Sequence, residues 1–298
     1  MRYHIQHQTV YQYNQPVSVS HHVLRLSPRG SARQQILAAD LEVTPSPAVI
    51  VSRSDYFGNE ATFVTIEGEH QQLAVTARSV VEILPFTGVD PDQTPAWEMI
   101  REACHGGTSV SAASRCGCEF AFPSTFIASR PEFAAYATVS FPSGRPILRG
   151  CLDLMERIHR DFKFDPRSTT VATPVEKVFQ QRRGVCQDFA QFQIASLRSM
   201  GLAARYVSGY LETAPPPGQP KLTGADASHA WVQVWCGESG WADLDPTNNL
   251  QPGERHVTLA VGRDFDDVSP LRGVLLGSGK HQLKVAVDVV PLDGNGVV

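Results

Sequence analysis

The chain has 298 residues, of which 42% are hydrophobic and 19% charged, and its formal net charge is −4. These values are typical of globular proteins, and the net negative charge gives no basic surface of the kind that nucleic-acid-binding proteins use. No run of about 18 apolar residues occurs, so we expect no membrane span. The first ten residues do not resemble a signal peptide, which favours a cytoplasmic protein without a disulfide framework for its six cysteines.

Residues 1–85 are predicted to form a β domain. Apolar and aromatic side chains alternate with polar ones at 3–13 and again at 73–83, the period of a strand with one buried face. Residues typical of turns gather at 14–16 and at 55–59. Several short strands separated by turns predict a β-sandwich-like arrangement.

Residues 86–148 form a mixed linking segment, with one helix expected around Trp97. From residue 149 onwards apolar side chains recur three and four positions apart, as they do in amphipathic helices. A capping-box pattern that begins at Thr173 predicts the start of one helix, and a second helix is expected from Cys186 to Met200.

Strands follow these helices. We expect one strand at 205–211, a hairpin from 229 to 245 and a last strand at 283–289. Helices followed by antiparallel strands are typical of the α+β class. The segment 149–298 is therefore predicted to be a core of helices packed on an antiparallel sheet, placed after the N-terminal β domain.

Cys186 is the first candidate for chemistry, because it follows Gly184 closely at the predicted start of a helix. The unpaired N–H groups and the dipole of a helix N-terminus favour the thiolate, which is the reactive form of cysteine. The same N–H groups can stabilise an oxyanion. A lone cysteine is more often a packed core residue than a nucleophile, so this position needs partners to become convincing.

His229 opens the predicted hairpin, and an imidazole becomes a catalytic candidate when a carboxylate fixes its tautomer. If the hairpin loop consists of Cys236–Gly240, antiparallel pairing sets Trp231 opposite Asp245. Asp245 then lies diagonal to His229 on the same face, whereas Asp243 lies one pair further away. A loop with an even number of residues would turn both aspartates to the other face.

The segments around these three residues resemble the core of bacterial transglutaminase-like proteins, and the first domain resembles the N-terminal region of that family. Nearly the whole chain is covered, and the motifs are specific in combination. The core segments are Gly184–Ala190, Gly201–Leu211, Ser228–Val234 and Gly240–Asn249, and the N-terminal ones are His7–Tyr13, Arg25–Arg29 and Asp55–Asn59.

This resemblance implies a papain-like fold with Cys186 as nucleophile, His229 as base and Asp245 as the residue that orients the histidine. It also implies action on amide bonds of a peptide or protein substrate, as a protease, an amidase or a transglutaminase, without a cofactor. A non-catalytic peptide-binding protein on the same fold is the alternative outside enzymology. Among the reactions we expect hydrolysis, because water is the abundant nucleophile and no residues indicate a site that holds an amine.

Two groups of residues are weaker candidates for metal ligands. One consists of Cys104, His105, Cys116 and Cys118, and the other of Asp264, Asp266 and Asp267. The first matches no standard zinc spacing, and the second lacks the glycine and the terminal glutamate of a calcium loop, so no metal is expected. Asp188 is expected to stabilise the helix start, and Trp231 could be either a core residue or part of the cleft.

Overall fold

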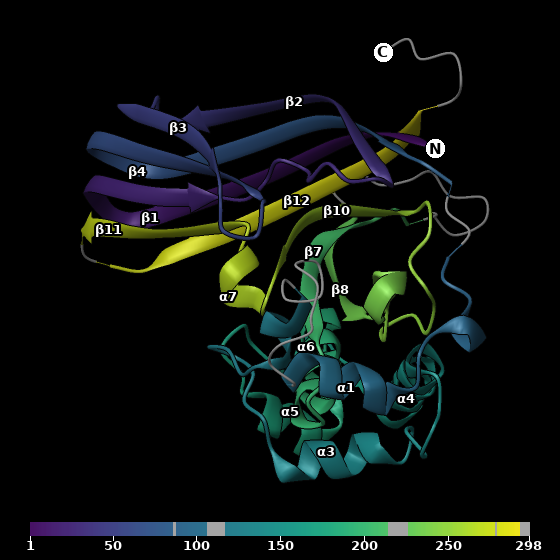
Figure 1. Ribbon diagram of the computed structural model, residues 1–298. Coiled ribbons are helices and arrows are strands. Elements are labelled where there is room, and N and C mark those ends of the chain that lie inside the picture. Colours follow the sequence, from purple (N-terminus) through teal and green to yellow (C-terminus); the bar gives the residue numbers. More distant parts are fainter. Residues whose placement is uncertain (86–87, 106–116, 214–225, 278, 293–298) are drawn as a thin grey trace, which may run out of the picture.

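The computed structural model describes residues 1–85, 88–105, 117–213, 226–277 and 279–292. These residues form a six-stranded antiparallel sheet, a four-stranded antiparallel sheet and a group of helices, so the predicted α+β class is confirmed. In Figure 1 the larger sheet lies across the top, the helices gather at the bottom, and the smaller sheet lies between them. No described helix is both long and apolar enough to cross a membrane.

The six-stranded sheet is built on two long strands, β1 (Arg2–Leu24) and β4 (Glu60–Ile83), which pair with each other along most of their length. Strands β2 (Gln34–Thr44) and β3 (Val49–Ser54) both pair with β4, and β11 (Leu271–Gly277) and β12 (His281–Leu292) both pair with β1. One continuous sheet therefore stands where the sequence predicts several short strands in a sandwich-like domain. Its buried side chains include a separate apolar cluster around Leu73.

The turn predicted at 14–16 is wrong, because these residues belong to β1. Pairing with β4 shifts its register between Gln12 and Val17 and resumes beyond the shift. An irregularity of this kind bends a strand and increases its twist without ending it, and it gives Pro16 a place outside the regular ladder. The result is a strand of 23 residues whose middle carries turn-forming residue types.

The strand predicted at 283–289 is present within β12, but it pairs with β1 and not with the sheet that follows the helices. Alternation of polar and apolar residues identifies a strand without identifying its neighbour. The last described strands thus complete the N-terminal sheet, although the sequence pattern places them with the segment 149–298.

The four-stranded sheet has the order β10–β7–β8–β9, and helix α6 packs against β7 and β8. Its strands are β7 (Ala204–Leu211), β8 (Ala227–Trp235), β9 (Trp241–Leu244) and β10 (His256–Gly262). The helices are α1 (Trp97–His105), α3 (Pro131–Thr138), α4 (Ile147–Asp161), α5 (Val175–Gln181), α6 (Cys186–Ser199) and α7 (Phe265–Val268). Shorter pieces are β5 (Lys163–Phe164), β6 (Arg183–Gly184), η1 (Pro91–Gln93), η2 (Glu119–Ala121) and η3 (Gly237–Ser239).

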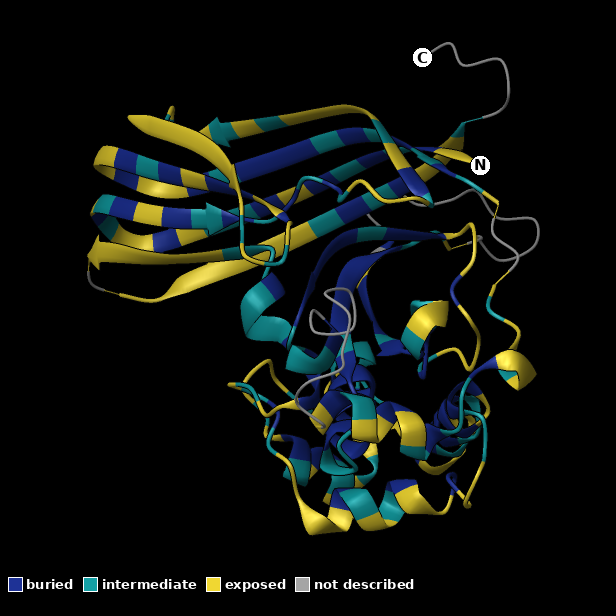
Figure 2. Cartoon of the chain, viewed as in Figure 1, coloured by how far each residue is buried: buried dark blue, intermediate teal, exposed yellow. Residues whose placement is uncertain are grey.

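Helix α6 is the central helix of the molecule, and the helix predicted at 186–200 is confirmed to within one residue. Every residue from Asp188 to Arg198 is buried, as the dark blue centre of Figure 2 shows. A helix that is buried on all sides is held by the elements around it. Gly201 follows with a φ of +78°, a left-handed conformation that favours glycine at a helix end.

Helix α5 begins where the sequence predicts, but not for the predicted reason. Its N-cap is Pro174, which offers no side-chain hydrogen bond. The Thr173 hydroxyl instead accepts the N–H of Thr170, so it closes the preceding turn and does not cap the helix.

Two amide side chains dock the six-stranded sheet onto β10. Gln34 donates to the carbonyl of Thr258 at 2.7 Å and accepts its N–H at 2.8 Å. Asn59 bonds both backbone groups of Val261 in the same way, at 2.8 Å each. Each amide therefore satisfies backbone groups as a neighbouring strand would, which fixes the position of β10 against the N-terminal sheet.

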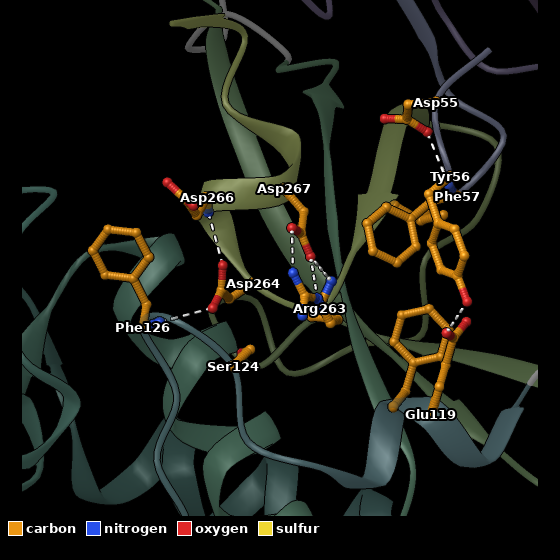
Figure 3. A network of polar contacts seen from close by, with 12 residues as sticks. Asp55, Tyr56, Phe57, Glu119, Ser124, Phe126, Arg263, Asp264, Asp266 and Asp267 are labelled. Carbon is orange, nitrogen blue, oxygen red and sulfur yellow. Dashed lines mark hydrogen bonds and ion pairs between the residues drawn. The ribbon is translucent and has the colours of Figure 1, made fainter.

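A second set of contacts joins the turn between β3 and β4 to η2 and packs it against the segment after β10 (Figure 3). Tyr56 donates its hydroxyl to Glu119 at 2.8 Å, and the Arg263 guanidinium lies 5.9 Å from the ring of Phe57. Arg263 also pairs with Asp267 at 2.9 Å. Together with the amide contacts, these interactions hold the two sheets in one arrangement.

Candidate active site

The start of α6 places Cys186. Val185 is extended, and Cys186 is the first residue of the helix, with its side chain half-buried. The Asp188 carboxylate accepts the N–H of Val185 at 2.8 Å and the hydroxyl of Thr169 at 2.6 Å. Asp188 therefore stabilises the helix start, as expected, and burial raises the pKa of its carboxyl against these two hydrogen bonds. A side chain at Gly184 would meet Asp188 at 2.6 Å, which explains the glycine at that position.

The hairpin of β8 and β9 has the register that a five-residue loop requires. Gln233 pairs with Asp243, and Trp235 pairs with Trp241. The ladder ends at Leu244, and Asp245 lies just beyond it. A five-residue loop therefore predicts the face on which both aspartates lie.

His229 and Asp245 are in direct contact. Nε2 of His229 lies 2.7 Å from Oδ2 of Asp245, both side chains are buried, and the carboxylate is completely inaccessible. Because this contact occupies Nε2, the other ring nitrogen is left for the thiol side, where the Cys186 side chain is close enough to act on the imidazole. The three residues are brought together from the start of α6, from β8 and from the end of β9.

Asp245 is surrounded by hydrogen-bond donors. Its Oδ1 accepts the backbone N–H groups of Thr247 and Asn248 at 3.0 and 3.2 Å. Its Oδ2 accepts His229 and the Asn248 amide at 2.7 Å each, and His256 at 3.2 Å. Burial raises the pKa of this carboxyl, but the donors outweigh burial and hold the pKa well below its usual range. The buried carboxylate therefore stays ionised.

The protonation state of His229 follows from its neighbours. Burial lowers the pKa of the imidazole, whereas the interactions with Asp245 and Cys186 raise it, to about 10 in total. At neutral pH the histidine is therefore a cation between a carboxylate and a thiol. An imidazolium beside a thiol favours the thiolate, and it can later give its proton to a leaving group.

Cys186 and His229 line an open pocket with a volume of about 440 Å³. Apolar side chains form part of its wall, among them Phe164, Val185 and Leu211. A second open pocket of about 530 Å³ shares three of its lining residues, Leu211, Thr213 and Asn248. The reactive atoms thus lie in a groove formed by these two adjoining pockets.

Trp231 belongs to the core and not to this groove. It is 1% exposed, and its indole N–H donates to Asp243 at 2.9 Å. Asp243 also accepts the Gln233 amide at 2.8 Å and pairs at 3.0 Å with Arg33, which directly precedes β2 of the N-terminal sheet. The two aspartates of the hairpin thus have separate tasks, one beside the imidazole and one at the junction of the sheets.

Two further residues that contact Asp245, Asn248 and His256, are not among the predicted site residues. Asn248 lies in the segment Gly240–Asn249. An aspartate three residues before it is typical of a turn that the aspartate side chain stabilises. His256 is a single histidine at the start of an apolar strand, eleven positions from the carboxylate, and only the tertiary fold brings the two together.

The candidate metal ligands are engaged in protein contacts. Cys118 contacts the carbonyl of Ala103, His105 contacts the carbonyl of Gly201, and Cys116 lies outside the described residues. The Asp264 carboxylate accepts the N–H groups of Phe126 and Asp266, as Figure 3 shows.

Three groups near the thiol also have atoms close enough to consider as metal ligands: His229, Asp245 and His256. Their separations from the shared carboxylate oxygen, 2.7 and 3.2 Å, are those of hydrogen bonds.

Comparison with known proteins places the chain in a family. Residues 3–82 match the bacterial transglutaminase-like N-terminal region, and residues 144–246 match the transglutaminase-like superfamily. An uncharacterized protein of Mycobacterium tuberculosis is 38% identical over 304 residues, which cover 99% of this chain and 95% of that protein. The chain belongs to the transglutaminase-like superfamily. Members of this superfamily are cysteine-dependent enzymes.

Other relatives of this transglutaminase-like protein differ in how much they share. A Mycobacterium leprae protein, also uncharacterized, is 32% identical over 98% of this chain and 99% of its own length. A protein-glutamine gamma-glutamyltransferase of Pseudomonas aeruginosa is 29% identical over 155 residues, 43% of this chain and 23% of that enzyme. The crystal structure of a candidate cysteine protease from Cytophaga hutchinsonii matches 98% of this chain and 92% of its own with a TM-score of 0.77 at 21% identity, which shows a shared fold.

Proposed function

We propose that this transglutaminase-like protein is a cysteine peptidase or amidase that hydrolyses amide bonds of a peptide or protein substrate. The observation that carries the proposal is the contact of 2.7 Å between His229 and a fully buried, ionised Asp245, beside the half-buried thiol of Cys186. In this proposal Cys186 is the nucleophile, His229 the base and acid, and Asp245 the orienting group.

The first chemical step joins the Cys186 sulfur to the substrate carbonyl carbon. The C–O π electrons move to oxygen, where free N–H groups at the start of α6 are available as donors. As the tetrahedral intermediate collapses, the C–N bond breaks and the imidazolium of His229 protonates the leaving amine. The products of this step are a thioester on Cys186, a free amine and a neutral imidazole.

The second step returns the enzyme to its starting state. Neutral His229 accepts a proton from water while the water oxygen attacks the thioester carbonyl. The C–S bond then breaks, which releases a carboxylic acid and restores the thiolate beside the imidazolium. Asp245 stays ionised throughout, because its role is to hold the imidazole in one tautomer and one orientation.

Amine transfer is the alternative reaction, since a primary amine in place of water would complete the same chemistry. The Pseudomonas aeruginosa relative is named for such a transfer, but it aligns with 43% of this chain. Transfer requires a second site that positions an amine and excludes water. The open groove beside Cys186 favours hydrolysis, because water can reach a thioester formed there.

A panel of peptide amides, incubated with and without a labelled primary amine, tests the proposal. We expect release of amine and acid by the wild type, little incorporation of the label, and no turnover by the Cys186→Ala variant. Cys118→Ala is the matched control, because Cys118 is the other half-buried cysteine in the described part of the chain.

The outcomes of this panel are distinct. Dominant incorporation of the label would replace hydrolysis by transfer and keep the nucleophile. Equal turnover by the wild type and Cys186→Ala would remove the mechanism. Binding of peptides without any turnover would favour the non-catalytic alternative. The cytoplasmic location stays a prediction, which fractionation of the producing cells would test.

A further inference from the structure

Asp245 lies between two histidines. His229 approaches its Oδ2 from β8 at 2.7 Å, and His256 approaches the same oxygen from β10 at 3.2 Å. The side chain of His256 is 5% exposed, and its ring centroid lies 6.0 Å from that of His229. These two strands are the neighbours of β7 in the four-stranded sheet, one on each side of it, so Asp245 contacts residues from both neighbours of β7.

The direction of the second contact is fixed by chemistry. An ionised carboxylate only accepts hydrogen bonds, so Nε2 of His256 carries the proton. The other nitrogen, Nδ1, is buried and has no partner among the described residues. The contact with Asp245 therefore fixes which ring nitrogen of His256 is the donor.

The surroundings of His256 differ from those of the thiol. His256 does not line the pocket that contains Cys186. It lines a small cavity of about 60 Å³ at the junction with the N-terminal sheet, together with Arg33, Asp243 and Trp231, and it also lines the second open pocket of about 530 Å³. The ring of Trp231 lies edge-on to it at 5.3 Å. The hydrogen bond to Asp245 therefore links His256 to the catalytic pair.

We propose that His256 is a positioning residue, which keeps the Asp245 carboxylate ionised and directed at His229. The proposal rests on the proposed function of the Cys186 site. The remaining donors to Oδ2, His229 and the Asn248 amide, both lie on the side of the pocket that contains Cys186, since both residues line it. Without His256 no side-chain donor would hold the carboxylate from the β10 side, and its negative charge would be less stabilised.

The charged and titratable groups around this network come from four elements. Asp245 is faced by His229 from β8, by His256 from β10 and, beyond His229, by Cys186 from α6. His256 is faced across the small cavity by Arg33 and by Asp243 of β9. Its chain neighbours Glu254 and Arg255 line the second open pocket together with His256 itself. Arg33 and Asp243 pair with each other, so they present no unbalanced charge to the imidazole.

The test compares His256→Leu, which removes the donor, with His256→Gln, whose amide can donate to the same oxygen. The measured quantity is the rate at which iodoacetamide alkylates Cys186, followed by peptide mass spectrometry between pH 2 and 9. This reaction needs no natural substrate. The thiolate and imidazolium depend on an ionised Asp245, so the rate falls where that carboxyl becomes protonated.

In His256→Leu we expect the acid limb of this profile to move up by about one pH unit, the shift that corresponds to loss of one hydrogen bond to a charged group. The profile of His256→Gln should match that of the wild type. His7→Leu is the matched control, because His7 is also buried and contacts β7 through the hydroxyl of Tyr210 at 2.8 Å, and its ring nitrogens bond Tyr210 and Thr9 and not Asp245. A purely structural role would lower the melting temperature of His256→Leu and leave the acid limb in place.

The possible failures are distinguishable. If Cys186 of the wild type reacts no faster than Cys118, the proposed function fails and the positioning role fails with it. If wild-type Cys186 reacts fast and the acid limb of His256→Leu is unmoved, only the positioning role is overturned. A shifted limb in His7→Leu would also overturn it, since the effect would then follow from loss of any buried histidine.

Discussion

The two sheets bury histidines with opposite consequences. In the six-stranded sheet, burial lowers the pKa of His7 and of His22 to about 4, so both are neutral at neutral pH. In the four-stranded sheet, His229 is comparably buried, yet its pKa is raised to about 10 by Asp245 and Cys186. A buried imidazole is neutral by default, and a carboxylate partner reverses this.

The same contrast holds for the other buried polar side chains. In the six-stranded sheet they are hydroxyls, amides and histidines. The buried carboxylates and the buried guanidinium of the described residues all lie between positions 188 and 264: Asp188, Arg198, Asp226, Asp245 and Asp264. Buried charge costs free energy unless it is paired, so its concentration in one part of the molecule marks that part as the place of the chemistry.

The largest effect is expected from Asp245→Asn. The amide keeps the shape of the side chain but removes the charge that holds His229 protonated, so we expect turnover to fall on the order of 10²–10⁴-fold. Asp243→Asn is the matched control on the same hairpin, because Asp243 bonds Trp231 and Arg33 and not the imidazole. Steady-state kinetics on a peptide amide checks both. Equal losses in the two variants would show that the hairpin matters only as a scaffold.

A smaller effect, on stability, is expected from Gly209→Ala. A methyl group at Gly209 would meet the carbonyl oxygen of Val257 at 2.1 Å and the ring of Trp231 at 2.5 Å. Overpacking of this kind costs about 1–3 kcal/mol of unfolding free energy. Gly30→Ala next to the six-stranded sheet is the control, because nothing lies within 4 Å of its added carbon. Urea unfolding measures both, and similar free energies would contradict the close packing at β7.

The histidines predict opposite pH windows of stability. The folded-state pKa of His229 is about 10, above the ordinary 6.5, so its contribution is complete below pH 6.5 and is lost as the pH rises towards 10. The folded-state pKa of His7 is about 4, so its neutral form favours the folded state above pH 6.5, and that contribution is lost as the pH falls towards 4. Unfolding curves of His229→Gln and His7→Gln against the wild type should diverge in these separate windows. If both variants differed from the wild type in the same pH range, the opposite pKa shifts of the two histidines would be contradicted.

The smallest effect is expected at an exposed ion pair of the six-stranded sheet. Arg78 lies 3.0 Å from Glu42, and both side chains are largely exposed. Exposed pairs contribute at most about 1 kcal/mol, so Arg78→Gln should change the unfolding free energy by less than that and leave activity intact. A loss of activity would show that the outer face of this sheet takes part in function.

Much of the site could be predicted from local sequence. The face on which Asp245 lies follows from the period of two in a hairpin and from the odd length of Cys236–Gly240. The start of α6 follows from its glycine and from the apolar residues that recur at helical spacing after Cys186. These predictions succeed because each depends on neighbours within about twenty positions, where strand and helix periods are reliable guides.

The parts that could not be predicted depend on distant pairing. Nothing in the alternation of β12 indicates that it pairs with β1, and nothing in the strand of His256 indicates a carboxylate beside its ring. The residues at 14–16 have the composition of a turn, but the partner strand β4 continues on both sides and carries β1 through a bulge. Tertiary pairing decides in each of these cases.

Acylation of Cys186 tests the central claim most directly. The wild type and His229→Gln are incubated briefly with the activated ester of a blocked dipeptide, quenched in acid and digested, and the mass of each cysteine-containing peptide is measured. We predict that the wild type carries the acyl group on Cys186 alone and that His229→Gln carries little. Acyl groups on Cys118 as much as on Cys186, or equal acylation of both proteins, would contradict the claim that His229 and Asp245 activate this thiol.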